Sequence, residues 1–339
     1  MRTFRSRTDL LEKISMTKAF LPALSPLRPD QRQGQPEGRW KLFLGLSRTP
    51  HGLLDMATPA TAALLVLGAL PPLEVVLIGT ATAFAGYTAV YALNDLVDYR
   101  VDKERLAKSE GQAKLEDLDG IFVRHPIARE MLSLRGGLFW FLFWAGLALA
   151  GAWYLNPVCA FLFVAVAALE TLYCKLLTIT PLKILPAALV KASGGLVGAY
   201  AVRPDPPAGF LAILVLWLAA WEVGGQNVAN DILDLEEDRK VGARTVATAL
   251  GMAESIFIAT AASSMAALAG VAVFWVSGSG LSWIYPVGAA ILSWKLLLEP
   301  VRGLYHQPGP KSAATLFNRS SYLPLGYLVV AAGSILLPF

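Results

Sequence analysis

Two stretches of the sequence repeat one pattern of carboxylate side chains. Each begins with Asn-Asp and follows the spacing NDxxDxxxD, at residues 94–102 and again at residues 230–238. The six carboxylates belong to Asp95, Asp98, Asp102, Asp231, Asp234 and Asp238. On a helix with about 3.6 residues per turn, positions i, i+3 and i+7 lie on one face. Each motif therefore predicts a column of three carboxylates.

Such a column is unfavourable unless something neutralises it. Like charges on one helix face destabilise the helix by roughly 0.2–0.5 kcal/mol per pair, whereas Mg²⁺ is commonly bound by carboxylates together with substrate phosphates. Two facing columns would hold Mg²⁺ and a diphosphate between them, and neutralising the diphosphate makes it a better leaving group. The predicted metal ligands are Asp95, Asp98, Asp231 and Asp234, and the predicted catalytic set adds Asp102 and Asp238. A solvated acidic loop explains one such motif more easily than two.

Apolar helices must position the two motifs. The chain has 339 residues, of which 55% are hydrophobic and 16% charged, and its mean hydropathy is +0.52, values that indicate a membrane protein. A bilayer core needs roughly 20 apolar residues per helix. Stretches of that length occur at residues 53–72, 73–94, 136–154, 157–174, 184–202, 209–230, 253–276, 281–298 and 321–338. The predicted fold is therefore all-α, a polytopic bundle of nine transmembrane helices with a cytoplasmic cap around the two Asp-rich motifs.

The positive charges lie in alternate loops. Lys and Arg cluster after the second, fourth, sixth and eighth predicted spans, whereas the intervening loops carry almost none. By the positive-inside rule the charged loops are cytoplasmic. We expect an integral, multi-pass protein of a prokaryotic cytoplasmic membrane, with its active site on the cytoplasmic side. This distribution accounts for the pI near 9.0 without a nucleic-acid partner. Residues 1–47 are predicted to be an N-terminal extension, and residues 48–339 the membrane domain.

Polar residues near the motifs are candidates for substrate binding. Asn94 and Asn230 open the motifs, and each either orients the diphosphate or an adjacent carboxylate, or caps a helix. Cations in neighbouring loops are expected to add positive charge around the diphosphate. They are Arg100, Lys175, Lys183, Arg239 and Lys240.

Two ionisable residues fall inside predicted spans. Lys191 lies eight positions after Lys183, and Glu222 lies nine positions before Asp231. At 1.5 Å per residue, both sit about 12–14 Å below the cytoplasmic surface. A charge in hydrocarbon is costly and finds a partner. We predict that Lys191 and Glu222 pair, either as a lock between helices or with a function. In the second case the pair binds a polar acceptor group, or Glu222 takes the proton that the acceptor loses.

The motifs and their surroundings resemble the UbiA superfamily of intramembrane prenyltransferases over roughly residues 45–339. The stretch from Gln226 and Asn227 to Thr245 is similar to the family's second motif with its trailing DRxxGxxT, which makes Asn227 a further candidate for substrate binding. Tyr173, Lys175 and Lys183 resemble the Tyr/Lys loop that contacts the diphosphate in this family. The segment at residues 124–129 is similar to the family's short Arg-Pro element, although a longer insert precedes it here.

The resemblance implies Mg²⁺-dependent transfer of an isoprenoid chain from a polyprenyl diphosphate to a small acceptor, most often an aromatic quinone precursor. A lipid, a sugar phosphate or a tetrapyrrole is an alternative acceptor within the same chemistry. A cation-coupled transporter is an alternative of another class, because repeated helices with intramembrane carboxylates occur there too. Transporter sites lie near the bilayer midplane, whereas both motifs here are predicted at one membrane surface.

Overall fold

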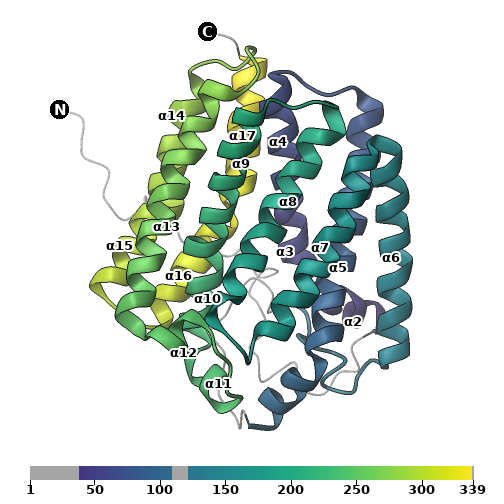
Figure 1. Ribbon diagram of the computed structural model, residues 1–339, viewed down its shortest axis with the longest axis vertical. Coiled ribbons are helices and arrows are strands. Elements are labelled where there is room, and N and C mark those ends of the chain that lie inside the picture. Colours follow the sequence, from purple (N-terminus) through teal and green to yellow (C-terminus); the bar gives the residue numbers. More distant parts are fainter. Residues whose placement is uncertain (1–37, 109–120, 338–339) are drawn as a thin grey trace, which may run out of the picture. The chain divides into compact units, whose positions relative to one another are not determined.

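The computed structural model describes residues 38–108 and 121–337. The regular elements in these two ranges are all helices (Figure 1), which confirms the all-α prediction for this part of the chain. Most of the predicted N-terminal extension lies outside the described residues, as do residues 109–120 of the insert that precedes the segment at residues 124–129. The helix α2 (Arg39–Leu46) falls within the predicted extension. Its residues Leu42 and Leu46 are buried in a cluster with Ala92 of the membrane bundle, so α2 packs against the bundle.

Seven helical segments of the described chain are long and apolar enough to cross a membrane, and they correspond to the second through eighth predicted spans. They are α5 (Leu73–Lys108), α6 (Leu134–Leu155), α7 (Pro157–Leu176), α8 (Ile184–Val202) with the turn before it, α9 (Ala208–Trp221) continued by η4 (Glu222–Asn227) and α10 (Val228–Leu233), α13 (Met252–Ala272) continued by η5 (Val273–Val276), and α14 (Ile284–Ser293) continued by η6 (Trp294–Leu298) and α15 (Glu299–His306). Large apolar side chains such as Phe139 and Phe143 are exposed on α6. This is the arrangement expected of helices surrounded by lipid.

The first and ninth predicted spans fall on shorter helices. Residues 53–72 overlap α3 (Thr49–Asp55) and α4 (Ala57–Leu67), and residues 321–338 overlap α17 (Leu323–Leu336), which follows α16 (Pro310–Ser321). The helix α4 has 11 residues and α17 has 14, fewer than the roughly 20 that cross a bilayer. Pro59 and Pro324 follow the two breaks, and each removes a backbone N–H donor. The carbonyl of Ser320, four positions before Pro324, instead accepts a hydrogen bond from Trp221 at 3.0 Å.

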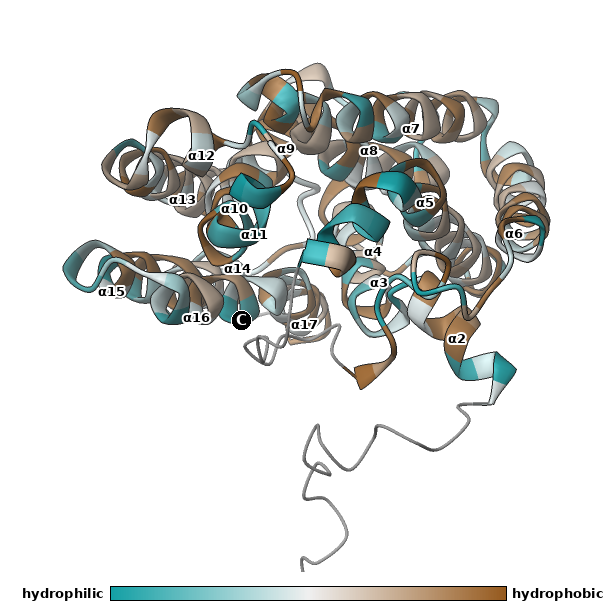
Figure 2. Cartoon of the chain, turned by 90° about the horizontal axis from the view of Figure 1, so that it is seen from below, coloured by the Kyte–Doolittle hydropathy of each residue, from teal (hydrophilic) through white to brown (hydrophobic). Residues whose placement is uncertain are grey.

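The polar residues gather at one end of the bundle. Seen from below, hydrophilic residues mark α11 (Leu235–Lys240) and the last turns of α5 (Figure 2). The helix α5 is 36 residues long, and the 21 residues before its motif already span about 32 Å at 1.5 Å per residue. The first Asp-rich motif therefore begins where a bilayer core of about 30 Å would end.

Candidate active site

The first motif lies inside α5 and not at its end. The helix continues past Asp102 to Lys108, so Asp95, Asp98 and Asp102 share one uninterrupted helix as predicted. Asp98 and Asp102 line a cavity of about 740 Å³. Asp95, with only 2% of its surface exposed, lies behind this wall.

The second motif is divided between two short helices. Asp231 lies on α10 and Asp238 on α11, and Asp234 lies between them with φ −94° and ψ 9°. The Nζ of Lys183 is 3.3 Å from Oδ1 of Asp231, and the backbone N–H of Val246 donates to Oδ2 at 3.0 Å. Because the chain bends at Asp234, these carboxylates form a curved wall of the cavity and not the straight column predicted from helix periodicity.

A π-helical turn, η4, precedes the second motif and turns its residues toward the cavity. Glu222, Gln226 and Asn227 of this turn line the cavity. Its glycines allow the close packing that the turn requires, since a Cβ on Gly224 would lie 2.5 Å from the backbone N of Ser263. Such turns inside α-helices are frequent at functional sites.

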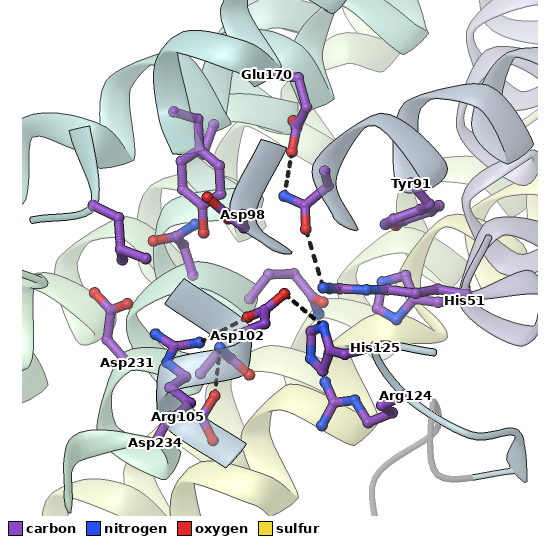
Figure 3. Close-up of a pocket in the computed structure, with 18 of the residues that line it drawn as sticks. His51, Tyr91, Asp98, Asp102, Arg105, Arg124, His125, Glu170, Asp231 and Asp234 are labelled. Atoms are coloured by element: carbon purple, nitrogen blue, oxygen red, sulfur yellow. Dashed lines mark hydrogen bonds and ion pairs between the residues drawn. The ribbon is translucent and has the colours of Figure 1, made fainter. Parts of the chain in front are cut away.

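Arg105 joins the two motifs. Its guanidinium donates a hydrogen bond to Asp238 and lies 3.9 Å from Asp102 (Figure 3). Burial raises the pKa of Asp238 to about 6, although the charge of Arg105 acts in the opposite direction. Five of the six predicted carboxylates line this one cavity: Asp98, Asp102, Asp231, Asp234 and Asp238.

His125 is a site residue that the sequence pattern did not reveal. Its Nδ1 lies 3.0 Å from Oδ1 of Asp95 and 2.8 Å from Oδ2 of Asp102. Burial disfavours the imidazolium, but the hydrogen bonds and charges of Asp102 and Asp95 outweigh burial and raise the pKa of His125. The only signal in the sequence was its place in the basic segment at residues 124–129.

The acidic residues fit a divalent cation. Ligand atoms of Asp95, Asp102 and His125 all lie within 4.8 Å of one another. Oδ2 of Asp95 is buried and accepts no hydrogen bond from any described residue, so it retains a lone pair for a cation. Asp98 and Asp234 face the same cavity. Carboxylate oxygens are ligands that Mg²⁺ prefers, so these residues suit the predicted ion.

The motif asparagines make side-chain hydrogen bonds within the site. Asn94 accepts a hydrogen bond from Arg48 at 3.1 Å and donates one to Glu170 at 2.7 Å (Figure 3). Asn230 donates to the carboxylate of Asp234 at 3.2 Å. The capping alternative is wrong for Asn94, because α5 neither begins nor ends there.

Only some of the residues predicted to surround the diphosphate line the cavity. Lys183 is buried and lines the cavity beside Tyr173, with its Nζ 3.4 Å from Oη of that tyrosine. The others are exposed and do not line the cavity: Arg100, Lys175, Arg239 and Lys240. Arg100 and Lys175 each lie two positions from a cavity residue, which places them about 200° around the helix from it. The cations that line the cavity in their place include Arg48, Lys103, Arg105, Arg124 and Arg129.

Lys191 and Glu222 pair on the inner wall of the cavity. The Nζ of Lys191 is 3.8 Å from Oε2 of Glu222, which confirms the predicted pairing. The same Nζ is closer to Asp55 of α3, at 2.7 Å, and Asp55 also accepts a hydrogen bond from Tyr91 at 2.6 Å. Oε2 of Glu222 is buried and accepts no hydrogen bond from the described chain. The predicted pair is thus part of a three-residue cluster that includes Asp55.

A second cavity of about 680 Å³ adjoins the first. Its walls are apolar and come mainly from α4 to α8, with Leu64 and Phe163 among the lining residues. Tyr87, Val90 and Val190 line both cavities. A ligand that crosses this junction would have a polar part among carboxylates and an apolar part inside the bundle.

The sequence also matches a known protein family. A model of the UbiA prenyltransferase family matches residues 56–322, which include both Asp-rich motifs. The chain belongs to the UbiA prenyltransferase family. It is therefore a prenyltransferase, and the seven apolar helical segments in the described part of the chain agree with an integral, multi-pass membrane protein.

Two curated relatives carry a named activity. The digeranylgeranylglyceryl phosphate synthase of Thermococcus kodakarensis is 27% identical to this UbiA-family chain over 263 residues, which cover 75% of this chain and 85% of that protein. The synthase of the same name from Thermococcus gammatolerans is 26% identical over 224 residues, covering 65% and 72% respectively.

Solved structures show the same fold. A structure of digeranylgeranylglyceryl phosphate synthase in membranes matches with a TM-score of 0.63 at 18% identity, covering 88% of this chain and 99% of that one. A UbiA homologue from Archaeoglobus fulgidus bound to DMAPP and Mg²⁺ matches with a TM-score of 0.64 at 16% identity, covering 87% and 99%. The helices described above are thus arranged as in the UbiA family.

Proposed function

We propose that this UbiA-family enzyme transfers an isoprenoid chain from a polyprenyl diphosphate to a hydroxyl group of a glyceryl phosphate lipid, with Mg²⁺ as cofactor. One observation carries the proposal. A polar cavity walled by five motif aspartates meets an apolar cavity at Tyr87, Val90 and Val190. A polyprenyl diphosphate has the same two parts in the same order, a charged head and an apolar chain.

The curated relatives favour a lipid acceptor over an aromatic one. Both are digeranylgeranylglyceryl phosphate synthases, a name that describes a glyceryl phosphate with two geranylgeranyl chains. The aromatic quinone precursor, which the family resemblance suggested first, has no such support. The proposed acceptor is therefore a glyceryl phosphate that already carries one chain, and the proposed donor is geranylgeranyl diphosphate.

The motif residues act on the diphosphate. Asp95, Asp98, Asp231 and Asp234 would hold Mg²⁺, which when bound neutralises the charge that accumulates on the departing diphosphate. Lys183 and Arg105 contribute fixed positive charges beside the two motifs, and the burial of Lys183 strengthens the effect of its charge. The bond between the donor carbon and its diphosphate oxygen breaks, and the allylic cation that remains is enclosed by apolar walls.

Glu222 is placed to take up a proton. The acceptor hydroxyl forms the new C–O bond and loses its proton, and Oε2 of Glu222 is a carboxylate oxygen on the cavity wall that accepts no hydrogen bond from the described chain. Lys191, which Asp55 holds in place, lies 3.8 Å from this oxygen and stabilises the carboxylate until the hydroxyl approaches. Geometry within hydrogen-bond reach is the first requirement for a general base.

We further propose nine membrane crossings, with the motifs on the cytoplasmic side of a prokaryotic membrane. The pairs α3–α4 and α16–α17 would supply the first and ninth crossings, because one residue separates the helices of each pair. The alternating Lys and Arg content of the loops supports a cytoplasmic position for the motif end. The segment at residues 121–130, α11 and α12 (Val246–Leu250) would then form the cap over the cavity.

The experiment uses purified protein in lipid nanodiscs with geranylgeranyl diphosphate and either Mg²⁺ or EDTA. Three acceptor conditions are compared: glyceryl phosphate carrying one geranylgeranyl chain, an aromatic hydroxy acid, and no acceptor. We expect prenylated product and equimolar diphosphate only with the lipid acceptor and Mg²⁺. Product from the aromatic acceptor alone would overturn the acceptor assignment. Absence of Mg²⁺-dependent diphosphate release in every condition would overturn the activity.

A further inference from the structure

Few residues line the junction between the two cavities. Only Tyr87 and Val90 of α5 and Val190 of α8 line both cavities among the described residues. Val90 follows Tyr87 by three positions, so the two lie on one face of α5. An apolar chain attached to a head group in the polar cavity must pass these side chains to reach the apolar cavity.

Gly194 fixes the place of the Tyr87 ring. It lies one helical turn after Val190 on α8, and it lines the apolar cavity. A Cβ on Gly194 would lie 2.7 Å from Oη of Tyr87 but 3.8 Å from its Cζ. The first distance is a clash, and the second is an ordinary van der Waals contact. Oη of Tyr87 therefore rests where only a glycine on α8 leaves room for it.

We propose that Tyr87 and Gly194 are specificity residues that decide whether a long isoprenoid chain of the donor can enter the apolar cavity. This inference rests on the proposed function, because it assumes that the diphosphate head binds among the motif aspartates. With glycine at position 194, the ring lies against α8 and the passage is open. A methyl group there would turn the ring away from α8 and across the junction.

The consequence depends on donor length. A five-carbon chain ends near the reaction centre, whereas a twenty-carbon chain gains most of its affinity from apolar surface buried beyond the junction. Blocking the junction should therefore weaken binding of the long donor and leave the short donor unaffected. A disturbance of the diphosphate site would weaken both donors.

The test measures direct binding of dimethylallyl diphosphate and geranylgeranyl diphosphate to purified protein with Mg²⁺ and no acceptor. For Gly194→Ala we expect at least ten-fold weaker binding of the twenty-carbon donor and binding of the five-carbon donor within two-fold of wild type. Gly146→Ala is the matched control, because Gly146 is a helical glycine with no atom within 4 Å of an added Cβ. It should bind both donors like wild type.

The suppressor variant makes the test specific to Tyr87. In Gly194→Ala/Tyr87→Phe the clashing oxygen is absent and the nearest ring atom is 3.8 Å away, so long-donor binding should return to within three-fold of wild type. Failure of this rescue in a protein of normal thermal stability, or equal weakening of both donors by Gly194→Ala, would overturn the inference. So would normal long-donor binding with loss of turnover, because the cavity would then hold the acceptor's chain. Wild-type protein that binds neither donor would instead refute the proposed function.

Discussion

The guanidinium of Arg105 on α5 donates a hydrogen bond to the carboxylate of Asp238 on α11. The two residues are 133 positions apart in the chain. This contact is a direct link between the first and second Asp-rich motifs. It also places a titrating carboxyl group, and not only a fixed charge, at the point where the motifs meet.

Asp238 should give the stability of the protein a pH dependence. Burial raises the pKa of Asp238 to about 6. The charge of Arg105 lowers this pKa, and the charges of Asp231 and Asp234 raise it further. A free aspartate has a pKa of about 3.9. The folded state therefore holds this proton more tightly than the unfolded state. The resulting stabilisation is complete below about pH 4 and is lost as the pH rises through about 6.

We expect the apparent melting temperature, measured with EDTA, to fall between about pH 5 and pH 7.5 less steeply in Asp238→Asn than in wild type, because the variant lacks this titration. Asp205→Asn removes an exposed aspartate and should keep the wild-type slope. Identical slopes for wild type and Asp238→Asn would show that Asp238 does not titrate as described.

The motif aspartates should be required for transfer and not for folding. Replacing Asp95, Asp98, Asp231 or Asp234 by Ala should reduce product formation at least about 100-fold, the scale for removing a group that stabilises transition-state charge. Asp102→Ala and Asp238→Ala should have smaller but measurable effects. Glu236→Ala is the control, because Glu236 is exposed beside the second motif. Activity within a few-fold of wild type in any two of the first four variants would exclude their role as metal ligands.

Glu222 and Asp55 should differ in what they affect. Glu222→Gln should keep the thermal stability and donor binding of wild type but lose at least about 100-fold in transfer to the lipid acceptor, within the range for a general base. Asp55→Asn removes the partner at 2.7 Å from Lys191. Breaking a buried ion pair in this way costs about 3–5 kcal/mol, so Asp55→Asn should unfold at lower temperature.

The comparison separates a helix lock from a catalytic group. If Glu222→Gln lowers the melting temperature as much as Asp55→Asn does and leaves the transfer rate per folded molecule unchanged, the cluster is only structural. A charge swap between positions 191 and 222 would not separate the two roles, because Lys191→Glu would place a second carboxylate beside Asp55.

Asn94 should orient the first motif through its amide. It bridges Arg48 and Glu170, and loss of such orienting hydrogen bonds typically costs about 10–100-fold in metal affinity or activity. We expect Asn94→Ala to require more Mg²⁺ for half-maximal rate and to be about 10-fold slower. A variant that melts earlier but keeps the Mg²⁺ dependence and rate of wild type would assign Asn94 a structural role alone.

The parts of the site that follow one helix could be predicted from the sequence. The spacing of Asp95, Asp98 and Asp102 predicted a shared helix, and depth along two helices predicted the pairing of Lys191 with Glu222. Both arguments need only the rise and turn of an α-helix. They fail where the chain leaves the regular helix, as at Asp234, where the second column bends.

The residues that reach the site from elsewhere could not be predicted in this way. His125 comes from a segment after α5, and Asp55 comes from α3, so neither is near its carboxylate or amine partners in the sequence. Arg100 and Lys175 show the opposite error, since closeness in sequence to a cavity residue says nothing about which side of the helix a residue occupies. The breaks in the first and ninth predicted spans were missed for a related reason. The hydropathy of a segment does not show whether a proline interrupts its helix.

The polar cavity walled by carboxylates meets an apolar cavity, so the two products of the proposed reaction can leave in different directions. Its products are an ionic diphosphate, which is soluble in water, and a lipid with an additional chain, which partitions into the bilayer by about 0.8 kcal/mol for each CH₂ buried. Each product would depart into the phase that dissolves it. The two phases would thus keep the products apart after release, and the partitioning of the lipid product into the bilayer would disfavour the reverse reaction.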